Sequence, residues 1–259
     1  AQNQFVMEKA FEGHPYSRSI IGLPEHLKNP RLSKLIEFYE QWYVPENMVL
    51  VLVGNIKAQQ ISGRINAAFG RLAAKPAPER KVYQNLEIKG RKQYSAKVGF
   101  YPQVAMVFNG VPAGHPDEDA LDIALALLNN NSQTGTMDKL VLDGELTSAG
   151  AYTRTFYDEN QRRFESTKSA EKKALKAIQQ IANGEFEDWK IDAIKAEKCR
   201  QFDLEMESNE DKAMILMNAF YNEQDLGDIL NYKDKIMAIT TDDIKRVAKK
   251  YLSDNYLAL

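Results

Sequence analysis

Two segments of the chain share one order of elements although they lie 208 residues apart. Each segment has the pattern of an amphipathic helix that ends at a tyrosine, followed by a turn with an asparagine and an apolar strand. The matched pairs are Ile36 with Ile244, Tyr39 with Val247, Tyr43 with Tyr251, Val44 with Leu252, Asn47 with Asn255, Val49 with Leu257 and Val51 with Leu259. Solenoid repeats recur about every 20–50 residues, so this spacing favours two duplicated domains. A chance match is the alternative, because helix–turn–strand units are common.

Composition places the chain among ordinary globular proteins. Of its 259 residues, 44% are apolar and 27% are charged, and 34 Lys and Arg against 36 Asp and Glu leave a formal net charge of −2. This balance argues against a nucleic-acid or membrane-surface partner held mainly by charge. The longest apolar runs, 48–53 and 123–128, have six residues, whereas a membrane-spanning helix needs about 20. We expect one large or two medium domains and no membrane span.

The single cysteine, Cys199, excludes an internal disulfide and every thiolate zinc cluster within the chain. A disulfide-free chain can fold in the cytosol or in the periplasm, so both compartments stay open. The first residues, Ala1 to Gln4, contain no initiator methionine and no signal-peptide pattern. We expect the chain to be a cut piece or a processed product.

The first third of the chain predicts one α/β block. Apolar residues at steps of three and four predict helices over 31–43 and 59–69. The run 48–53 between them predicts a fully buried strand, because it is short, continuous and aliphatic. Residues 73–80 contain two prolines and no apolar period, so they predict an extended connector and a domain boundary.

The rest of the chain predicts a second block, and the whole pattern predicts an α+β fold with an antiparallel or mixed sheet and helices packed on one face. The expected elements are strands over 94–100 and 104–108, a helix capped by Asp117, a helix over 137–142, a hairpin of 149–157 with 161–168, helices from 170 to 251, the last capped by Thr240, and a strand over 256–259. The predicted core-facing stripes are Phe186, Trp189, Ala193, Ala196, Cys199, Phe202 and Met206, and then Met214, Met217 and Phe220.

The histidines offer no zinc-binding pattern. The chain has His14, His26 and His115, and none lies four residues from another, so neither orientation of the two-histidine zinc helix exists. His115 precedes three acids at 117–119, which favour a helix N-terminus more than a metal. His14 before a proline fits a ligand, but packing under the turn is the simpler interpretation.

Motifs for phosphate binding and nucleophilic catalysis are also missing from the sequence. The glycines considered are Gly135, Gly144 and Gly150, and the serines are Ser132, Ser148 and Ser166. The glycines do not have the spacing of a phosphate-binding loop, and the serines lack the glycine-flanked elbow of a hydrolase. Cys199 lies within a helical stripe, distant in sequence from any histidine. We predict no catalytic, cofactor-binding or metal-binding residue in this chain.

Several short sequence segments are more specific than any single residue. They are GHPYSRSIIG from Gly13, LIEFY from Leu35, WYVPENMVLVLVGN from Trp42, FGRL from Phe69, NGEF from Asn183, AEK from Ala196, ES from Glu207 and TTDD from Thr240. Together they resemble the pitrilysin/insulinase family of zinc metallopeptidases, the inverzincins. The resemblance covers nearly the whole chain, and it implies duplicated α/β-roll domains, in agreement with the repeat.

The same resemblance implies a zinc site in the parent protein that this chain does not supply. In the family, a His-x-x-Glu-His helix and a later glutamate precede the segment that corresponds to Gly13 onward. Glu8 and Glu12 are too close to His14 to be that glutamate, so we carry over no zinc ligand. In related proteins, the half that grips the substrate has an arginine and a tyrosine seven residues apart. The corresponding residues of this chain, 139–152, contain no arginine. This favours the second domain of a first half over the substrate-gripping domain of a second half.

The resemblance therefore divides the chain into the C-terminal part of a first peptidase-like domain (1–74), a linker (75–90) and a second peptidase-like domain (91–259). We expect part of a zinc-dependent metalloendopeptidase that contributes to the peptide-substrate chamber, with zinc bound elsewhere in the parent. The expected partners are a peptide or unfolded protein substrate and the remaining domains of the parent. One alternative is a non-catalytic relative that binds peptides or scaffolds a catalytic partner, and another is an unrelated module that binds a small molecule.

Overall fold

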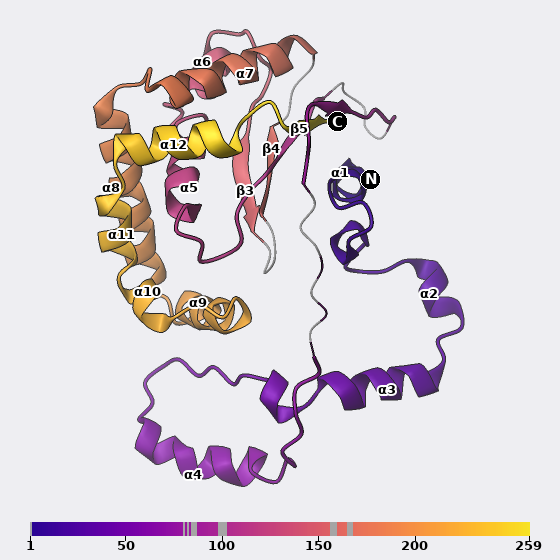
Figure 1. Cartoon of the computed structure of the whole chain (residues 1–259). Helices are drawn as coiled ribbons and strands as arrows, with labels where there is room; N and C mark the ends of the chain where they lie inside the picture. Colours follow the sequence, from indigo (N-terminus) through magenta and orange to yellow (C-terminus); the bar gives the residue numbers. More distant parts are fainter. Residues whose placement is uncertain are drawn as a thin grey trace. The chain divides into compact units, whose positions relative to one another are not determined.

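The chain forms two compact units in the computed structural model shown in Figure 1. The structure describes residues 2–79, 81, 83, 87–97, 103–155, 160–164 and 168–259. The first unit comprises Ala1–Arg18, Tyr83–Phe202 and Gly227–Leu259, and the second comprises Ser19–Val82 and Asp203–Leu226. None of the helices in the described ranges is both long and apolar enough to cross a membrane.

A five-stranded mixed sheet lies in the first unit. Its strands are β1 (Lys92–Gln93), β2 (Met106–Asn109), β3 (Ala151–Thr155), β4 (Asn160–Phe164) and β5 (Tyr256–Ala258). Their order across the sheet is β1-β5-β2-β4-β3, where β1 pairs with β5 in parallel and all other pairs are antiparallel. Among the described strands, β3 therefore forms one edge of the sheet.

Successive side chains of the central strands enter two different apolar clusters, as the strand period of two requires. On β2, Met106 and Phe108 belong to the larger cluster and Val107 belongs to the smaller one. On β5, Leu257 also belongs to the smaller cluster. Both faces of the central strands are thus buried, which explains why Met106 to Phe108 of β2 and all of β5 are apolar.

Helices cover both faces of this sheet. The larger cluster includes residues of α5 (Glu118–Ala126), α6 (Thr136–Leu142), α7 (Lys168–Asn183) and α12 (Thr241–Tyr251), and the smaller one includes residues of α1 (Gln2–Ala10). Figure 1 shows α5 and α12 on one side of the sheet and α1 on the other. The unit also contains η1 (Pro15–Ser17) and α11 (Tyr232–Ala238).

The described part of the second unit contains helices and no strand. Its helices are α2 (Pro24–Lys28), α3 (Leu32–Trp42), η2 (Pro45–Asn47), α4 (Ala58–Phe69) and α9 (Asn209–Tyr221). Two further helices, α8 (Asp188–Glu205) and α10 (Leu226–Leu230), begin in the residues of one unit and end in those of the other.

The predicted α+β class and most predicted helices are confirmed, although helices cover both faces of the sheet rather than the one face expected. The helices α3, α4, α6 and α12 lie within one or two residues of their predicted bounds, and β3 and β4 form the predicted hairpin. Thr240 caps α12: its hydroxyl accepts a hydrogen bond from the Asp243 N–H at 3.1 Å, and the Asp243 carboxylate accepts one from the Thr240 N–H at 3.0 Å. Residues 94–97 of the strand predicted over 94–100 lie in no strand, because β1 ends at Gln93. Residues 98–100 of that prediction and the hairpin turn at 158–159 lie outside the described residues.

The predicted strand over 48–53 is not found. Met48 has an extended backbone (φ −127°, ψ 144°), but no described strand pairs with this run. The side chains of Met48, Val49, Leu50 and Leu52 are 45–50% exposed. An apolar run becomes a strand only where a neighbouring strand satisfies its backbone hydrogen bonds, and the described part of this unit supplies no such neighbour.

The predicted core seam on α8 is wrong at Trp189, Ala193 and Ala196, which are exposed. The helix instead buries Ile191 and Ile194. The sequence has apolar residues on two adjoining faces of this helix, so periodicity alone does not choose between them.

A lysine helps to select the buried face of α8. Lys195 is buried, and its ammonium donates hydrogen bonds to the carbonyl oxygens of Met237 at 3.1 Å and of Ile239, at the end of α11. These carbonyls have no partner within their own helix, so the ammonium satisfies them. The contact joins residues more than 40 positions apart, and no local pattern announces it.

The predicted stripe on α9 is also wrong. Met214, Met217 and Phe220 are 41–47% exposed, and the buried residue of this helix is Ala219.

Candidate functional site

The three histidines form no metal site with the other described residues. Each Nδ1 accepts a hydrogen bond from a nearby backbone N–H: His14 from Tyr16 at 3.2 Å, His26 from Leu23 at 3.3 Å, and His115 from Asp117 at 2.9 Å. Nowhere in the described ranges do three His, Cys, Asp or Glu side chains gather closely enough to hold a metal ion. The residues present therefore do not fit the zinc site that the family resemblance implies for the parent.

His14 packs under its turn. It is buried, and its ring lies 5.6 Å from that of Phe11, 4.5 Å from that of Tyr16 and 5.0 Å from that of Tyr83, centroid to centroid. With its Nδ1 also bound to the backbone, the side chain acts as a cap for η1.

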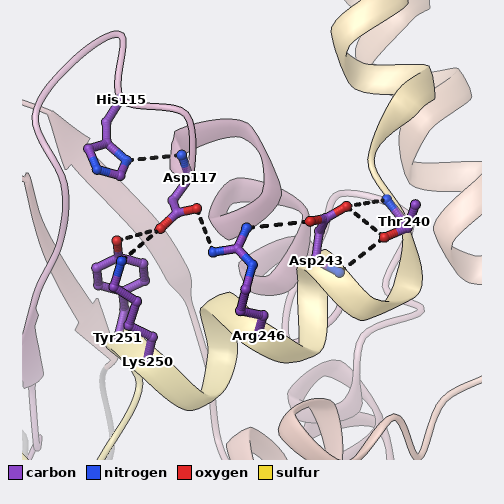
Figure 2. Close-up of polar contacts among 7 residues, drawn as sticks. All are labelled: His115, Asp117, Thr240, Asp243, Arg246, Lys250 and Tyr251. Atoms are coloured by element: carbon purple, nitrogen blue, oxygen red, sulfur yellow. Dashed lines mark hydrogen bonds and ion pairs between the residues drawn. The ribbon is translucent and has the colours of Figure 1, made fainter.

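Asp117, at the N-cap position of α5, is the centre of a charged network (Figure 2). Its buried carboxylate accepts hydrogen bonds from Arg246 Nη1 at 2.6 Å, Lys250 Nζ at 3.1 Å and Tyr251 Oη at 2.6 Å. All three donors lie on α12, so the network fastens the start of α5 to that helix. Asp117 occupies the predicted N-cap position of α5, but its side chain makes no capping hydrogen bond, because its carboxylate binds these three donors instead.

The network fixes the charge state of Asp117. Burial alone disfavours the ionised carboxyl, but hydrogen bonds from Tyr251, Arg246 and Lys250 outweigh burial and hold the pKa of Asp117 far below its usual value. An acid with so low a pKa stays ionised at neutral pH and is unsuited to general acid–base catalysis.

A second charged network surrounds Glu171. Its buried carboxylate accepts two hydrogen bonds from the Arg91 guanidinium, at 2.7 and 3.0 Å, and one from the Tyr256 hydroxyl at 2.8 Å. These contacts join α7 to β5 and to the residue before β1. Both networks are paired internally, which indicates a structural role.

The feature best suited to bind a ligand is a groove of about 660 Å³ beside the edge strand β3. Side chains of α5, of the loop after it, of β3 and of α8 line it: Asp122, Leu125, Ala126, Asn129, Asn130, Asn131, Ser132, Thr134, Ala151, Tyr152, Thr153, Trp189, Ala193, Ile194, Glu197 and Lys198. Its volume is in the range of pockets that hold small molecules or a few residues of a peptide.

Hydrogen bonds hold the walls of this groove together at both ends. At one end Asp122 accepts a hydrogen bond from the Thr153 hydroxyl at 2.8 Å and pairs with Lys198 at 3.4 Å. At the other end the Asn129 side chain accepts one from the Ala151 N–H at 3.3 Å. Asp122 on α5 thus contacts α8 through Lys198, and Asn129, three residues after α5 ends, lies beside the start of β3.

The loop after α5 is held rigidly at the second end. The Asn130 amide donates to the Ala126 carbonyl at 2.9 Å and to the Thr134 hydroxyl at 3.0 Å. Asp138, at the start of α6, accepts hydrogen bonds from the Asn129 amide and from the Asn130 backbone. The groove is therefore formed before any ligand binds.

The edge strand presents backbone groups to the groove. Because the Ala151 N–H donates to Asn129, it points away from β4. Alternate residues of an antiparallel strand face the same way, so the Thr153 N–H and carbonyl also point away from β4. No described residue takes up these Thr153 groups, which leaves them available to another strand.

Comparison with known proteins identifies the family. The sequence profile described as "Peptidase M16 inactive domain" matches residues 31–198, more than half of the chain, and the chain belongs to this family. The resemblance to the pitrilysin/insulinase zinc metallopeptidases is thereby confirmed.

Relatives and solved structures agree with this assignment. Zinc protease PqqE of Helicobacter pylori is 23% identical over 257 residues, which are 95% of this chain and 58% of PqqE. A solved protease from Helicobacter pylori has a TM-score of 0.85 at 21% identity, over 95% of this chain and 62% of that one. The ferredoxin protease FusC, solved in complex with Arabidopsis ferredoxin, has a TM-score of 0.68 at 17% identity, over 99% of this chain and 31% of that one. The two solved structures show the shared fold, and the chain spans less than two thirds of each of these proteins.

Sequence reasoning missed the groove and both charged networks. The groove joins α5, β3 and α8, which are separated along the chain, and only its asparagine run at 129–131 is unusual locally. The asparagine run is recognisable in the sequence as a polar cluster that ends an apolar helix. The residues of β3 and α8 that lie beside it in the groove are not recognisable from the sequence.

Proposed function

We propose that this chain forms a wall of the peptide-substrate chamber in a zinc-dependent metalloendopeptidase of the pitrilysin/insulinase type. Membership of the M16 inactive-domain family supports the class of parent protein. Zinc and the His-x-x-Glu-His helix would belong to other parts of the parent. No chemical step is assigned to residues of this chain.

The observation that carries the proposal is the edge strand β3 beside a preformed groove. An extended peptide can add to a sheet edge through backbone hydrogen bonds, with alternate side chains entering pockets beside it. The outward N–H and carbonyl of Thr153 supply one such pair, and the groove lies where the side chains of an added strand would point. The complex of the related FusC with ferredoxin supports a polypeptide as the ligand class.

The domain division proposed from the sequence differs from the two compact units, which group residues 1–18 with 83–202 and residues 203–226 with 19–82. We assign residues 1–74 to the end of a first peptidase-like domain, 75–90 to a linker and 91–259 to a second domain. The proposed division is based on the duplicated domains of the family, whereas the compact units are defined by contacts between residues. The two differ at α1, which packs on the sheet of the second domain. The unpaired apolar run 48–53 has the exposure expected of a strand whose sheet partners lie in another part of the parent.

A second candidate is a non-catalytic relative that binds peptides or scaffolds a catalytic partner. The paired charged networks and the lack of a metal cluster in the described ranges are equally compatible with it. The residues of the parent gene upstream of this chain decide: a His-x-x-Glu-His motif there favours the peptidase, and its absence favours the non-catalytic relative.

Peptide binding by strand addition can be tested on the chain itself. Ten-residue fluorescein-labelled peptides rich in Val, Thr and Phe should raise the fluorescence anisotropy on binding. In an extended peptide, alternate backbone N–H groups point to the same edge, so N-methylation of the odd-numbered or of the even-numbered amides removes the donors of one edge. One of these two parities should weaken binding at least about tenfold, and the other should change it little. Equal effects for both parities, or no binding, would contradict the proposal.

A variant pair in the protein gives the matching control. Thr153→Pro removes the outward N–H of the edge strand and should abolish binding, whereas Thr153→Ala keeps the N–H and should retain most of it. Circular dichroism of both variants checks that the fold persists.

A further inference from the structure

Trp189 is an exposed indole on the wall of the groove. Its side chain is 54% exposed, although tryptophan is among the residues that gain most from burial. We propose that Trp189 selects a large uncharged apolar side chain, aromatic or aliphatic, from an extended peptide paired with β3. This inference rests on the proposed function and names the kind of peptide that the groove accepts.

The surface next to Trp189 suits an apolar side chain. Leu125 and Ile194 are buried and line the groove, and the small side chains of Ala126 and Ala193 leave space between them and the indole. An apolar group placed there would be removed from water together with part of the indole. Exposed tryptophans in preformed pockets are frequent anchors of binding interfaces.

The charges of the groove argue against a charged side chain. Asp122 pairs with Lys198 at 3.4 Å, and Glu197 accepts two hydrogen bonds from Arg200, at 2.6 and 2.9 Å. Each carboxylate that lines the groove thus already has a cation. A charged residue of the peptide would lose hydration without gaining an unpaired opposite charge, so an uncharged one is favoured.

Two tryptophans, Trp42 and Trp189, make a direct test possible. In a Trp42→Phe background, Trp189 is the sole indole, and titration with a ten-residue Val/Thr peptide that carries one Phe should shift its emission to the blue. Anisotropy should give dissociation constants at least about tenfold weaker for the same peptide with Phe→Ala, Phe→Lys or Phe→Glu.

A double-mutant cycle isolates the contact. Trp189→Ala should weaken binding of the Phe peptide to about the affinity of the Ala peptide, and it should leave binding of the Ala peptide nearly unchanged. Trp189→Phe should keep the affinity for the Phe peptide within about threefold of wild type. If the Phe peptide binds with the parity dependence of strand addition but Trp189→Ala changes nothing and the emission does not move, the inference is overturned and the proposed function stands. If no peptide binds, both are overturned.

Discussion

The Tyr251 hydroxyl donates a 2.6 Å hydrogen bond to the carboxylate of Asp117, a residue 134 positions earlier in the chain. Tyr251 ends α12 and Asp117 precedes α5, so the bond joins two of the helices that pack on the larger apolar cluster. Arg246 and Lys250 add two more contacts to the same carboxylate (Figure 2). We therefore expect Asp117 to contribute to the stability of the sheet-containing unit.

Asp117→Asn should lower the free energy of unfolding by about 1–3 kcal/mol, because it weakens three charge-assisted contacts to a buried group. Urea denaturation followed by circular dichroism measures the change. Asp242→Asn is the control, since Asp242 is highly exposed and pairs with Lys245 on its own helix. That change should stay within about 0.5 kcal/mol, and equal losses for the two variants would contradict the network's role.

The stabilisation from Asp117 should depend on pH in one direction. The pKa of Asp117 in the folded chain is lowered, whereas the unfolded chain has the ordinary value of about 3.9. The contribution is therefore complete above about pH 4 and is lost as the pH falls from there toward the lower folded-state pKa. Urea denaturation at pH 6, 4 and 3 should show the difference between the wild type and Asp117→Asn shrinking at the lowest pH, and a constant difference would argue against this assignment.

Removal of the α12 cap should destabilise the chain moderately. Thr240→Ala deletes the hydroxyl that accepts the Asp243 N–H, at a cost of about 1 kcal/mol. Thr240→Ser keeps a hydroxyl and should differ from wild type by only a few tenths of that. Thermal and urea denaturation of both variants make the comparison, and a serine variant as unstable as the alanine variant would show that the cap is not the cause.

Truncation of a buried and of an exposed apolar residue should give clearly different results. Ile244 of α12 is fully buried in the larger cluster, so Ile244→Ala should cost about 2–5 kcal/mol. Met217 of α9 was predicted to be core but is 41% exposed, and Met217→Ala should cost less than about 1 kcal/mol. Similar losses in the two variants would restore the core interpretation of the α9 stripe.

The chain alone should retain no stoichiometric zinc. The Nδ1 atoms of its three histidines are bound to backbone N–H groups, and the described residues contain no cluster of three ligand-type side chains. Metal analysis after dialysis should find far less than one zinc per chain, apart from weak surface binding. One tight zinc per chain that disappears in a His115→Ala variant would refute the expectation.

Local patterns in the sequence were sufficient for elements that local forces determine. The α12 cap was predictable because Thr240 and Asp243 have the spacing of a capping box. The apolar stripe of α5 was predictable because Ala120, Ala124 and Leu127 repeat with the helical period and are all buried.

Elements that depend on distant partners were not predictable in this way. Trp189 was assigned to the core, but Lys195 on the same helix is held by carbonyls of α11, and a different face is buried. The sequence predicts Asp117 at the N-cap of α5 but not the three donors from α12 that bind its carboxylate. Tertiary contacts override local propensity at such positions.

The alternation of β2 and β5 between two apolar clusters has a practical consequence for trimming this protein. Val107 and Leu257 face away from the main helical layer, and α1, through Val6 and Met7, covers them. A shortened protein that begins at the linker would keep every strand and yet expose this second face to water. Such a truncation is expected to aggregate, whereas joining the first eighteen residues back to it, even as a separate peptide, should restore a soluble sheet.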